Sequence, residues 1–239
     1  PTLAAGSAGA LREVAVCFAG QWRWNSVLSG AVQTTSKHLV NVLDADVYVE
    51  LSAGDFCGEQ HASNLSLACD GSAVARHLRQ HFKRRLRSFS FHRDPSLEEL
   101  QQHFNLHGEQ MRYASLGGVT LFTPGEHLFF KSYLFSCRKM SKCLNTTASF
   151  EEAHGQRYRR IIYSRLDLRW FADHPPLEVL DKRFLWFQQA CSAFLGIDDC
   201  HLVANRKDAE VLFRQWDRLV SGSAFVTPNL DAPSMLAMA

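Results

Sequence analysis

The stretch REVAVCFAG, residues 12–20, decides the fold class because it holds a compact apolar run that ends at a glycine. The run spans residues 14–19 and Gly20 closes it, which is typical of a buried strand. In residues 26–43, which follow, apolar positions recur at steps of three to four residues, as on the buried face of a helix. Residues 44–52, DADVYVELS, indicate a second apolar strand. A strand, a helix and a strand in this order form a crossover unit, which favours a parallel sheet covered by helices.

The remaining sequence continues the alternation of helices and strands. Helices are expected at 71–87, at 94–104 (with a capping box of Ser96 and Glu99), at 126–145 and at 207–220. Strands are expected at 88–92, in the RIIYSRLDL segment 160–168, at 182–188 and within 196–206. The predicted fold is therefore α/β, a mostly parallel sheet flanked by helices, in one domain (1–239) with its core at about residues 12–220.

Composition limits the classes of function. The chain has 239 residues, of which 46% are hydrophobic and 21% charged, as in an ordinary globular domain. A formal net charge of +2 is too small to imply a polyanionic partner over the whole surface, so no nucleic acid is expected. No run of about 18 apolar residues occurs, so no membrane span is expected in this piece. The start at Pro1, without methionine, predicts a piece excised from a longer protein, with any signal or anchor removed.

The cysteines bear on the cellular compartment. The seven cysteines fall into three local pairs plus Cys17, and the pairs are Cys57 with Cys69, Cys137 with Cys143, and Cys191 with Cys200. Local disulfides, together with the glycosylation sequons at Asn64 and Asn145, favour a glycoprotein of the Golgi or secretory lumen. The alternative is a cytoplasmic protein with buried thiols.

Ligands of open α/β sheets collect at the carboxyl ends of the strands. Three segments are expected there: GQWR at 20–23, RLDLRW at 165–170 and GIDD at 196–199. Their amides, guanidiniums and carboxylates suit a nucleoside diphosphate and a divalent metal such as Mg²⁺ or Mn²⁺. Neither a G-x-x-x-x-G-K loop nor a G-x-G-x-x-G motif is present, which argues against kinase-like and dinucleotide-binding functions.

Four segments in order carry a resemblance to a family. CFAGQWRWN, DADVYVEL, EEAHGQRYRRIIYSRLDLRW and GIDDCHLVANRKDAEVLFRQW resemble a group of GT-A-type glycosyltransferases of algae and related eukaryotes, over about residues 12–220. The resemblance implies a GT-A (Rossmann-like) domain that moves a sugar from a nucleotide-sugar donor to a glycan or other hydroxyl acceptor. It places Gly20, Gln21 and Arg23 near the nucleotide, and it places Asp167 where GT-A enzymes usually have a metal-binding D-x-D pair. Arg165 occupies the first position of that pair, so Mn²⁺ or Mg²⁺ is expected with only one carboxylate.

Further roles follow from position along the predicted strands. Arg165 and Arg169 are expected to act as fixed positive charges beside the donor, and Asp46 to contact the ribose. Asp198 or Asp199 is the predicted group that orients or deprotonates the acceptor hydroxyl.

Simpler structural roles exist for the same residues. Arg165 and Asp167 are two residues apart on a strand, so they could form a surface salt bridge worth less than about 1 kcal/mol. Asp46 suits a turn, and the DAD of residues 44–46 imitates D-x-D but precedes its strand. Asp198 and Asp199 are typical turn residues, Gln21 and Arg23 could cap the next helix, and His77 and His81 indicate a helix face rather than a metal site.

Two other functions remain open at this point. One is a non-catalytic carbohydrate-binding or scaffold domain that kept the fold without the second carboxylate. The other is a nucleic-acid-binding module that uses the arginine-rich segment 76–87, whose arginines are expected on the outer face of a helix.

Overall fold

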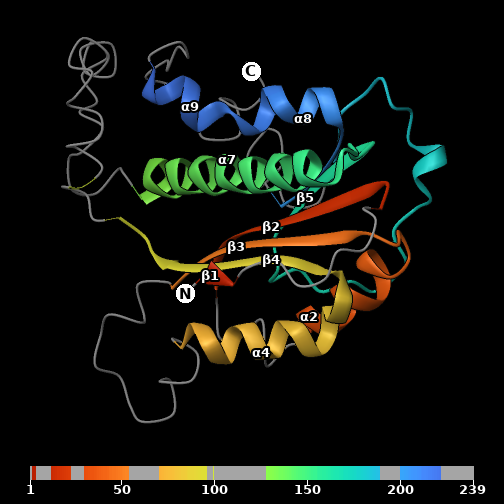
Figure 1. Cartoon of the computed structure of the whole chain (residues 1–239), viewed down its shortest axis with the longest axis horizontal. Helices are drawn as coiled ribbons and strands as arrows, with labels where there is room; N and C mark the ends of the chain where they lie inside the picture. The colour runs from red at the N-terminus through yellow and green to blue at the C-terminus, as the bar shows by residue number, and fades with distance from the viewer. Residues whose placement is uncertain are drawn as a thin grey trace.

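A computed structural model describes residues 2–3, 12–22, 30–53, 70–95, 99, 128–188 and 200–221 (Figure 1). Within these residues the sheet has seven strands, in the order β1-β4-β3-β2-β5-β7-β6. Their bounds are β1 Thr2–Leu3, β2 Val14–Trp22, β3 Asp46–Ala53, β4 Leu86–Arg93, β5 Arg160–Ser164, β6 Trp186–Phe187 and β7 His201–Asn205. Strands β2 to β5 are mutually parallel, whereas β1, β7 and β6 each pair antiparallel with their neighbours β4, β5 and β7. The predicted α/β class with a mostly parallel sheet is confirmed.

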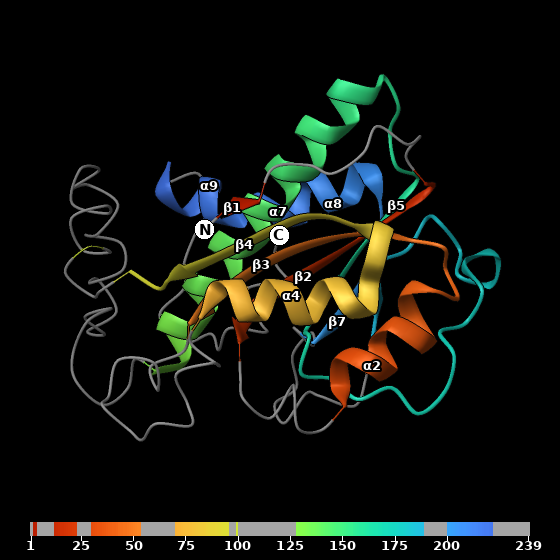
Figure 2. The ribbon, with the colours of Figure 1, turned by 60° about the horizontal axis from the view of Figure 1, so that its bottom comes forward.

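Helices cover both faces of this sheet. The described helices are α2 Ala31–Thr35 with a π-helical continuation Ser36–Val40, α4 Gly71–Phe82 with a 3₁₀ turn Lys83–Arg85, α7 Leu128–His154, a 3₁₀ turn Leu177–Val179, α8 Arg206–Phe213 and α9 Gln215–Val220. Figures 1 and 2 show α7, α8 and α9 on one face and α2 and α4 on the other. The helices predicted within 26–43, 71–87, 126–145 and 207–220 are all present, the last one divided in two. The helix predicted at 94–104 lies almost wholly outside the described residues.

Strand β2 lies in the middle of the sheet, and both of its faces are apolar. Val16 and Phe18 pack in the core beneath α2 and α4, together with Leu78 and Phe82 of α4. The opposite face carries small side chains, Ala15, Cys17 and Ala19, which pack beneath α7. Small residues on a strand allow a helix to approach the backbone closely, so α7 lies directly over β2.

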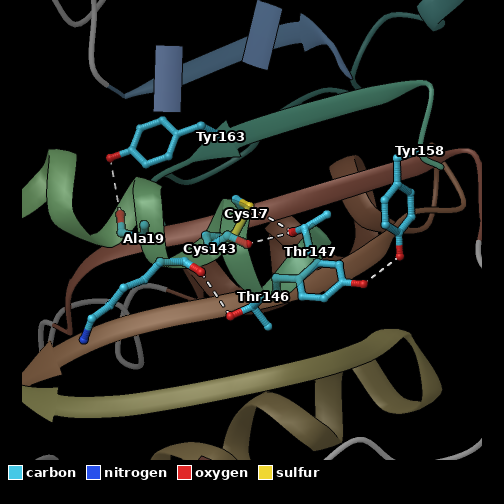
Figure 3. The surroundings of a disulfide bond; sticks show 9 residues. Cys17, Ala19, Cys143, Thr146, Thr147, Tyr158 and Tyr163 are labelled. Atoms are coloured by element: carbon cyan, nitrogen blue, oxygen red, sulfur yellow. Dashed lines mark hydrogen bonds between the residues drawn. A yellow bond between two sulfur atoms is a disulfide. The ribbon is translucent and has the colours of Figure 1, made fainter. Parts of the chain in front are cut away.

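A disulfide fixes this contact between α7 and β2. It joins Cys17 of β2 to Cys143 of α7, two residues that are 126 positions apart and fully buried (Figure 3). The predicted pairing of Cys137 with Cys143 is therefore wrong, and Cys143 is bonded instead to Cys17, the cysteine left over by the three local pairs. Local spacing misled the prediction because α7 brings residues from distant parts of the chain together. The other two predicted pairs include cysteines outside the described residues.

Among the described helices, none combines the length and the apolar character that a bilayer span requires.

Candidate functional site

The strand order reverses beside β2. The chain builds β2, β3 and β4 toward one side, then crosses over through α7 and adds β5 on the other side of β2. In open α/β sheets, such a reversal leaves a crevice at the carboxyl ends of the two strands, and ligands bind there. The carboxyl ends of β2 and β5 therefore mark the first place to look for a site.

A pocket lies at this point. Its walls come from the ends of β2 and β5, from the segment after β5 and from α7, and the lining residues are Ala19, Gly20, Gln21, Leu51, Phe135, Ser136, Lys139, Tyr163, Arg165, Leu166 and Asp167. Four of the residues predicted from sequence, Gly20, Gln21, Arg165 and Asp167, are thus brought together. Lys139 also lines the pocket and was not predicted from the sequence.

Gly20 leaves open space at the end of β2. Its φ of 155° is one that residues with side chains rarely adopt, and a Cβ atom built on it would meet no atom within 4 Å. A glycine at a strand end allows a ligand to approach the backbone closely.

Arg165 and Asp167 form a bidentate ion pair on one wall of the pocket. Arg165 Nε donates to Asp167 Oδ1 at 2.9 Å and Nη2 donates to Oδ2 at 2.6 Å. This pairing raises the pKa of Arg165, against the opposing effect of its burial. The Arg165 side chain is 30% exposed and that of Asp167 is 18% exposed, so the pair sits at the pocket wall rather than on the open surface. The guanidinium is charged and held in one orientation.

Lys139 and Asp94 form a second, more deeply buried ion pair. Lys139 Nζ lies 3.1 Å from Asp94 Oδ1 and donates to Ser52 Oγ at 2.7 Å. Ser52 Oγ donates to Asp94 Oδ2 at 2.6 Å, and Gln21 Nε2 donates to the same oxygen at 3.3 Å. Burial lowers the pKa of Lys139, while the charge of Asp94 acts in the opposite direction. The network joins β2, β3, the residue after β4 and α7 at the carboxyl ends of the strands.

The described residues do not make a complete divalent-metal site. Asp167 is the carboxylate at the motif position, and both of its oxygens already accept hydrogen bonds from Arg165. Asp94 is likewise paired with a cation, Lys139. Within the part of the chain that is described, His, Cys, Asp and Glu side chains form no group of three or more that could hold an ion, and His77 with His81 gains no third ligand. Among the described residues that line the pocket, Arg165 and Lys139 are the cationic side chains and Asp167 is the acidic one.

The structure does not bring Asp46 into the pocket. Asp46 is the first residue of β3, at the amino end of the strand, whereas the pocket lies at the carboxyl ends. Its carboxylate is fully buried and accepts from Arg87 Nε at 2.8 Å, from Tyr158 Oη at 2.9 Å and from the backbone N–H of Arg12 at 3.1 Å. Asp46 thus links residues at the amino ends of the strands, which we call the amino edge of the sheet. The predicted contact of Asp46 with the ribose has no geometric support.

Two arginines of segment 76–87 also belong to this amino edge. Arg87 is 5% exposed and pairs with Asp46, and Arg85 pairs with Asp44, which is also bound by Arg12. The expectation that the arginines lie on an outer face is wrong for Arg87, because the helix ends at Phe82 and Arg87 lies on β4.

The other predicted site residues have separate positions. Arg169 is exposed, and its guanidinium lies 5.5 Å from the ring centre of Phe171 rather than among the pocket residues. Arg23, Asp198 and Asp199 lie outside the described residues.

A sequence signal could have revealed Lys139. Phe135, Lys139 and Cys143 recur at four-residue steps and are all buried, so Lys139 is a lysine on the apolar stripe of its helix. Lysines are almost never fully buried without a partner, which makes such a position informative.

Histidines support the loop that carries Asp167. His201 of β7 is 7% exposed, and neither of its ring nitrogens has a hydrogen-bond partner in the described part of the chain. Its ring centre lies 5.3 Å from that of buried His174 and 5.1 Å from that of Trp170, both in the segment after β5. The pKa of His201 is lowered to about 3, first by burial and then by His174, and burial also lowers the pKa of His174.

We therefore expect the protein to lose stability in mild acid. An unfolded histidine binds a proton below about pH 6.5, whereas folded His201 stays neutral to about pH 3. Because the unfolded state binds more protons in this window, the free energy of unfolding falls as the pH drops from about 6.5 toward 3. Thermal melts at pH 7.5, 6 and 5 should show this slope, and His201→Phe should flatten it. An unchanged slope in His201→Phe contradicts the assignment.

No protein-family model matches the chain, and no curated protein sequence matches it.

Proposed function

We propose that the chain is a GT-A-type glycosyltransferase that moves a sugar from a nucleoside-diphosphate donor to a hydroxyl acceptor. The observation that carries the proposal is the meeting of two held cations, Arg165 and Lys139, with Gly20 and Gln21 in one pocket at the strand-order reversal. Asp167, which the family resemblance places at the D-x-D position, lines the same pocket.

The chemistry of such a pocket suits a diphosphate leaving group. When the bond between the sugar and the phosphate breaks, negative charge develops on the departing nucleoside diphosphate. Positive groups that are already oriented stabilise this charge without reorganising during the reaction. Arg165 can present its remaining N–H groups to phosphate oxygens while Asp167 holds it, and Lys139 can contribute a compact charge. Since the described residues do not complete a metal site, no step is assigned to Mn²⁺ or Mg²⁺.

For activation of the acceptor hydroxyl, we propose the two carboxylates predicted from the sequence. Asp198 and Asp199 remain the proposed groups that orient or deprotonate the acceptor hydroxyl, a role typically worth about 10²- to 10⁴-fold in rate.

A second candidate function is a non-catalytic carbohydrate-binding or scaffold domain. The observation that favours it concerns Asp167, which lines the pocket, and Asp94, which bonds the lining residues Gln21 and Lys139. Both carboxylates are engaged by cations of the chain itself. The two candidates differ in turnover: the enzyme releases free nucleotide from its donor, and the scaffold does not.

Nucleotide binding tests the proposal directly. A panel of UDP, GDP, CMP and the corresponding sugar nucleotides should include one that raises the melting temperature, because a ligand that binds only the folded state stabilises it. Arg165→Gln should weaken that binding at least about tenfold, since it removes a charge-assisted phosphate contact. Donor hydrolysis, measured with Mn²⁺, with Mg²⁺ and with a chelator, then separates enzyme from scaffold and tests the predicted cofactor.

Arg183→Gln is the matched control. Arg183 forms a similar pair with an aspartate two residues away, Asp181, but its side chain is 77% exposed and does not line the pocket. If no nucleotide shifts the melting temperature, or if Arg165→Gln binds nucleotide as the parent does, the proposed site is wrong.

A further inference from the structure

Strands β3 and β4 carry polar side chains on the face of the sheet that is directed toward α7. On β3, Val47, Val49 and Leu51 belong to the apolar core on the α4 side, whereas the alternate residues are Asp46, Tyr48, Glu50 and Ser52. On β4, Phe89 and Phe91 belong to the same core, and the alternate residues are Ser88, Ser90 and His92. A central strand of a parallel sheet is normally apolar on both faces. Three of these polar residues have structural partners: Asp46 pairs with Arg87, Tyr48 packs in the core beneath α7, and Ser52 bonds Asp94. Glu50 is not accounted for in this way.

Glu50 is the most costly member of this face. It is 5% exposed, and its Oε2 atom has no hydrogen-bond partner among the described residues. The hydroxyl of Ser90, its register partner on β4, is hydrogen-bonded to the carboxyl group. A buried carboxyl oxygen without a partner costs stability and therefore calls for an explanation, and a ligand contact is one such explanation.

Several other polar groups surround Glu50. On β4, His92 Nδ1 lies 3.4 Å from Ser90 Oγ, and burial, followed by Lys142 and Lys139, lowers the pKa of His92 to about 4. From α7, Lys142 is half-buried, and its charge acts on both Glu50 and His92. At neutral pH this neighbourhood therefore holds a neutral imidazole, a hydroxyl, an ammonium and a carboxyl group.

This set of groups favours one class of ligand. A cation would meet Lys139 and Lys142, and an anion would meet Glu50. A neutral polyhydroxyl compound meets both donors and acceptors, because each of its hydroxyls can donate one hydrogen bond and accept others. We propose that the strip formed by Glu50, Ser90, His92 and Lys142 binds a carbohydrate, with Glu50 Oε2 accepting a hydrogen bond from a sugar hydroxyl.

The strip adjoins the pocket at the strand-order reversal. Ser52 follows Glu50 by two residues on the same face of β3 and receives a hydrogen bond from Lys139, which lines the pocket. If the chain is a glycosyltransferase as proposed above, the strip is its acceptor subsite. That role rests on the proposed function, whereas carbohydrate binding by the strip does not.

Saturation-transfer NMR with methyl glycosides of glucose, galactose, mannose, xylose and N-acetylglucosamine tests the binding. We expect the parent chain to bind at least one of them, and Glu50→Gln to weaken that binding at least about tenfold. Glu50→Gln should melt at or above the parent temperature, because a neutral amide replaces a buried ionisable carboxyl group, one of whose oxygens has no hydrogen-bond partner among the described residues. Ser90→Ala provides a second variant with the same expected loss of binding, and Glu152→Gln, on the exposed side of α7, should bind as the parent does.

Three results would overturn the inference: no glycoside binds the parent, Glu50→Gln and Ser90→Ala both bind as the parent does, or the loss of binding accompanies a large fall in melting temperature in both variants. The nucleotide panel keeps the two proposals apart. Glycoside binding that depends on Glu50, without any nucleotide binding, supports the strip and refutes the transferase. Nucleotide binding without glycoside binding refutes the strip alone.

Discussion

Asp167→Asn is expected to lower the rate of sugar transfer by at least about 100-fold while the melting temperature changes by less than about 3 °C. Asp167 orients Arg165 with both carboxylate oxygens, whereas asparagine offers one oxygen and turns an N–H₂ group toward the guanidinium. Loss of one oriented group that stabilises transition-state charge typically costs about 10²- to 10³-fold in rate. The stability cost stays small because a partly exposed ion pair contributes about 1 kcal/mol or less.

Asp173→Asn is the control for this prediction. Asp173 belongs to the same segment after β5 and pairs with His38, but it is exposed and does not line the pocket. Initial rates for both variants, with donor varied at saturating acceptor, give kcat and KM separately. Parent-like transfer by Asp167→Asn would leave Asp167 as a strand-exit residue with a local salt bridge and no part in the reaction.

Replacing both Cys17 and Cys143 by alanine is expected to lower the free energy of unfolding by about 2–5 kcal/mol. The bond closes a loop across 126 positions, and such a long cross-link restricts the unfolded chain strongly. It also bears on the site, since Ala19 lies two residues after Cys17 and Lys139 lies one helical turn before Cys143. Figure 3 shows the bond beside Ala19 and Thr147, between β2 and α7. Without the bond, we expect weaker nucleotide binding as well as lower stability.

Cys137→Ala is the matched variant for the disulfide. Cys137 is buried on the same helix and takes no part in the Cys17–Cys143 bond, so it reports the cost of removing a buried sulfur alone. Urea denaturation of the three proteins separates this packing cost from the cross-link. Equal midpoints for the double variant and Cys137→Ala, or alkylation of Cys17 and Cys143 in the unreduced, unfolded chain, would contradict the assignment.

The strands were predictable from sequence where apolar runs were continuous. Residues 14–19 and 161–163 gave β2 and β5 because both faces of these strands are buried, and a turn signal or a charge follows each run. The interpretation of β3 as a plain apolar strand missed Glu50 and Ser52, since valine and leucine at alternate positions dominate the segment. Period-two alternation in DVYVELS and in SFSFH would have indicated a polar face on both strands.

The candidate site was predictable only in part, because it depends on the order of the strands. Gly20, Gln21, Arg165 and Asp167 follow from the rule that strand ends bind ligands, once β5 is placed next to β2. Lys139 and Asp94 come from elements whose relation to β2 no local pattern encodes. Asp46 was correctly expected where its strand begins, and the structure places it there, at the end of β3 away from the pocket.

The two short strands that border the sheet bear on self-association. An unpaired strand edge offers its backbone groups to another chain, and short edge strands limit how far such pairing can extend. β6 has only two residues, and next to it Phe184 and Leu185 are 57% and 37% exposed. The charged residues Lys182 and Arg183 precede them, in the place where charges usually interrupt aggregation-prone segments. If both charges were neutralised, nothing in this short segment would interrupt its apolar residues. Strand β6 could then pair with a strand of another molecule.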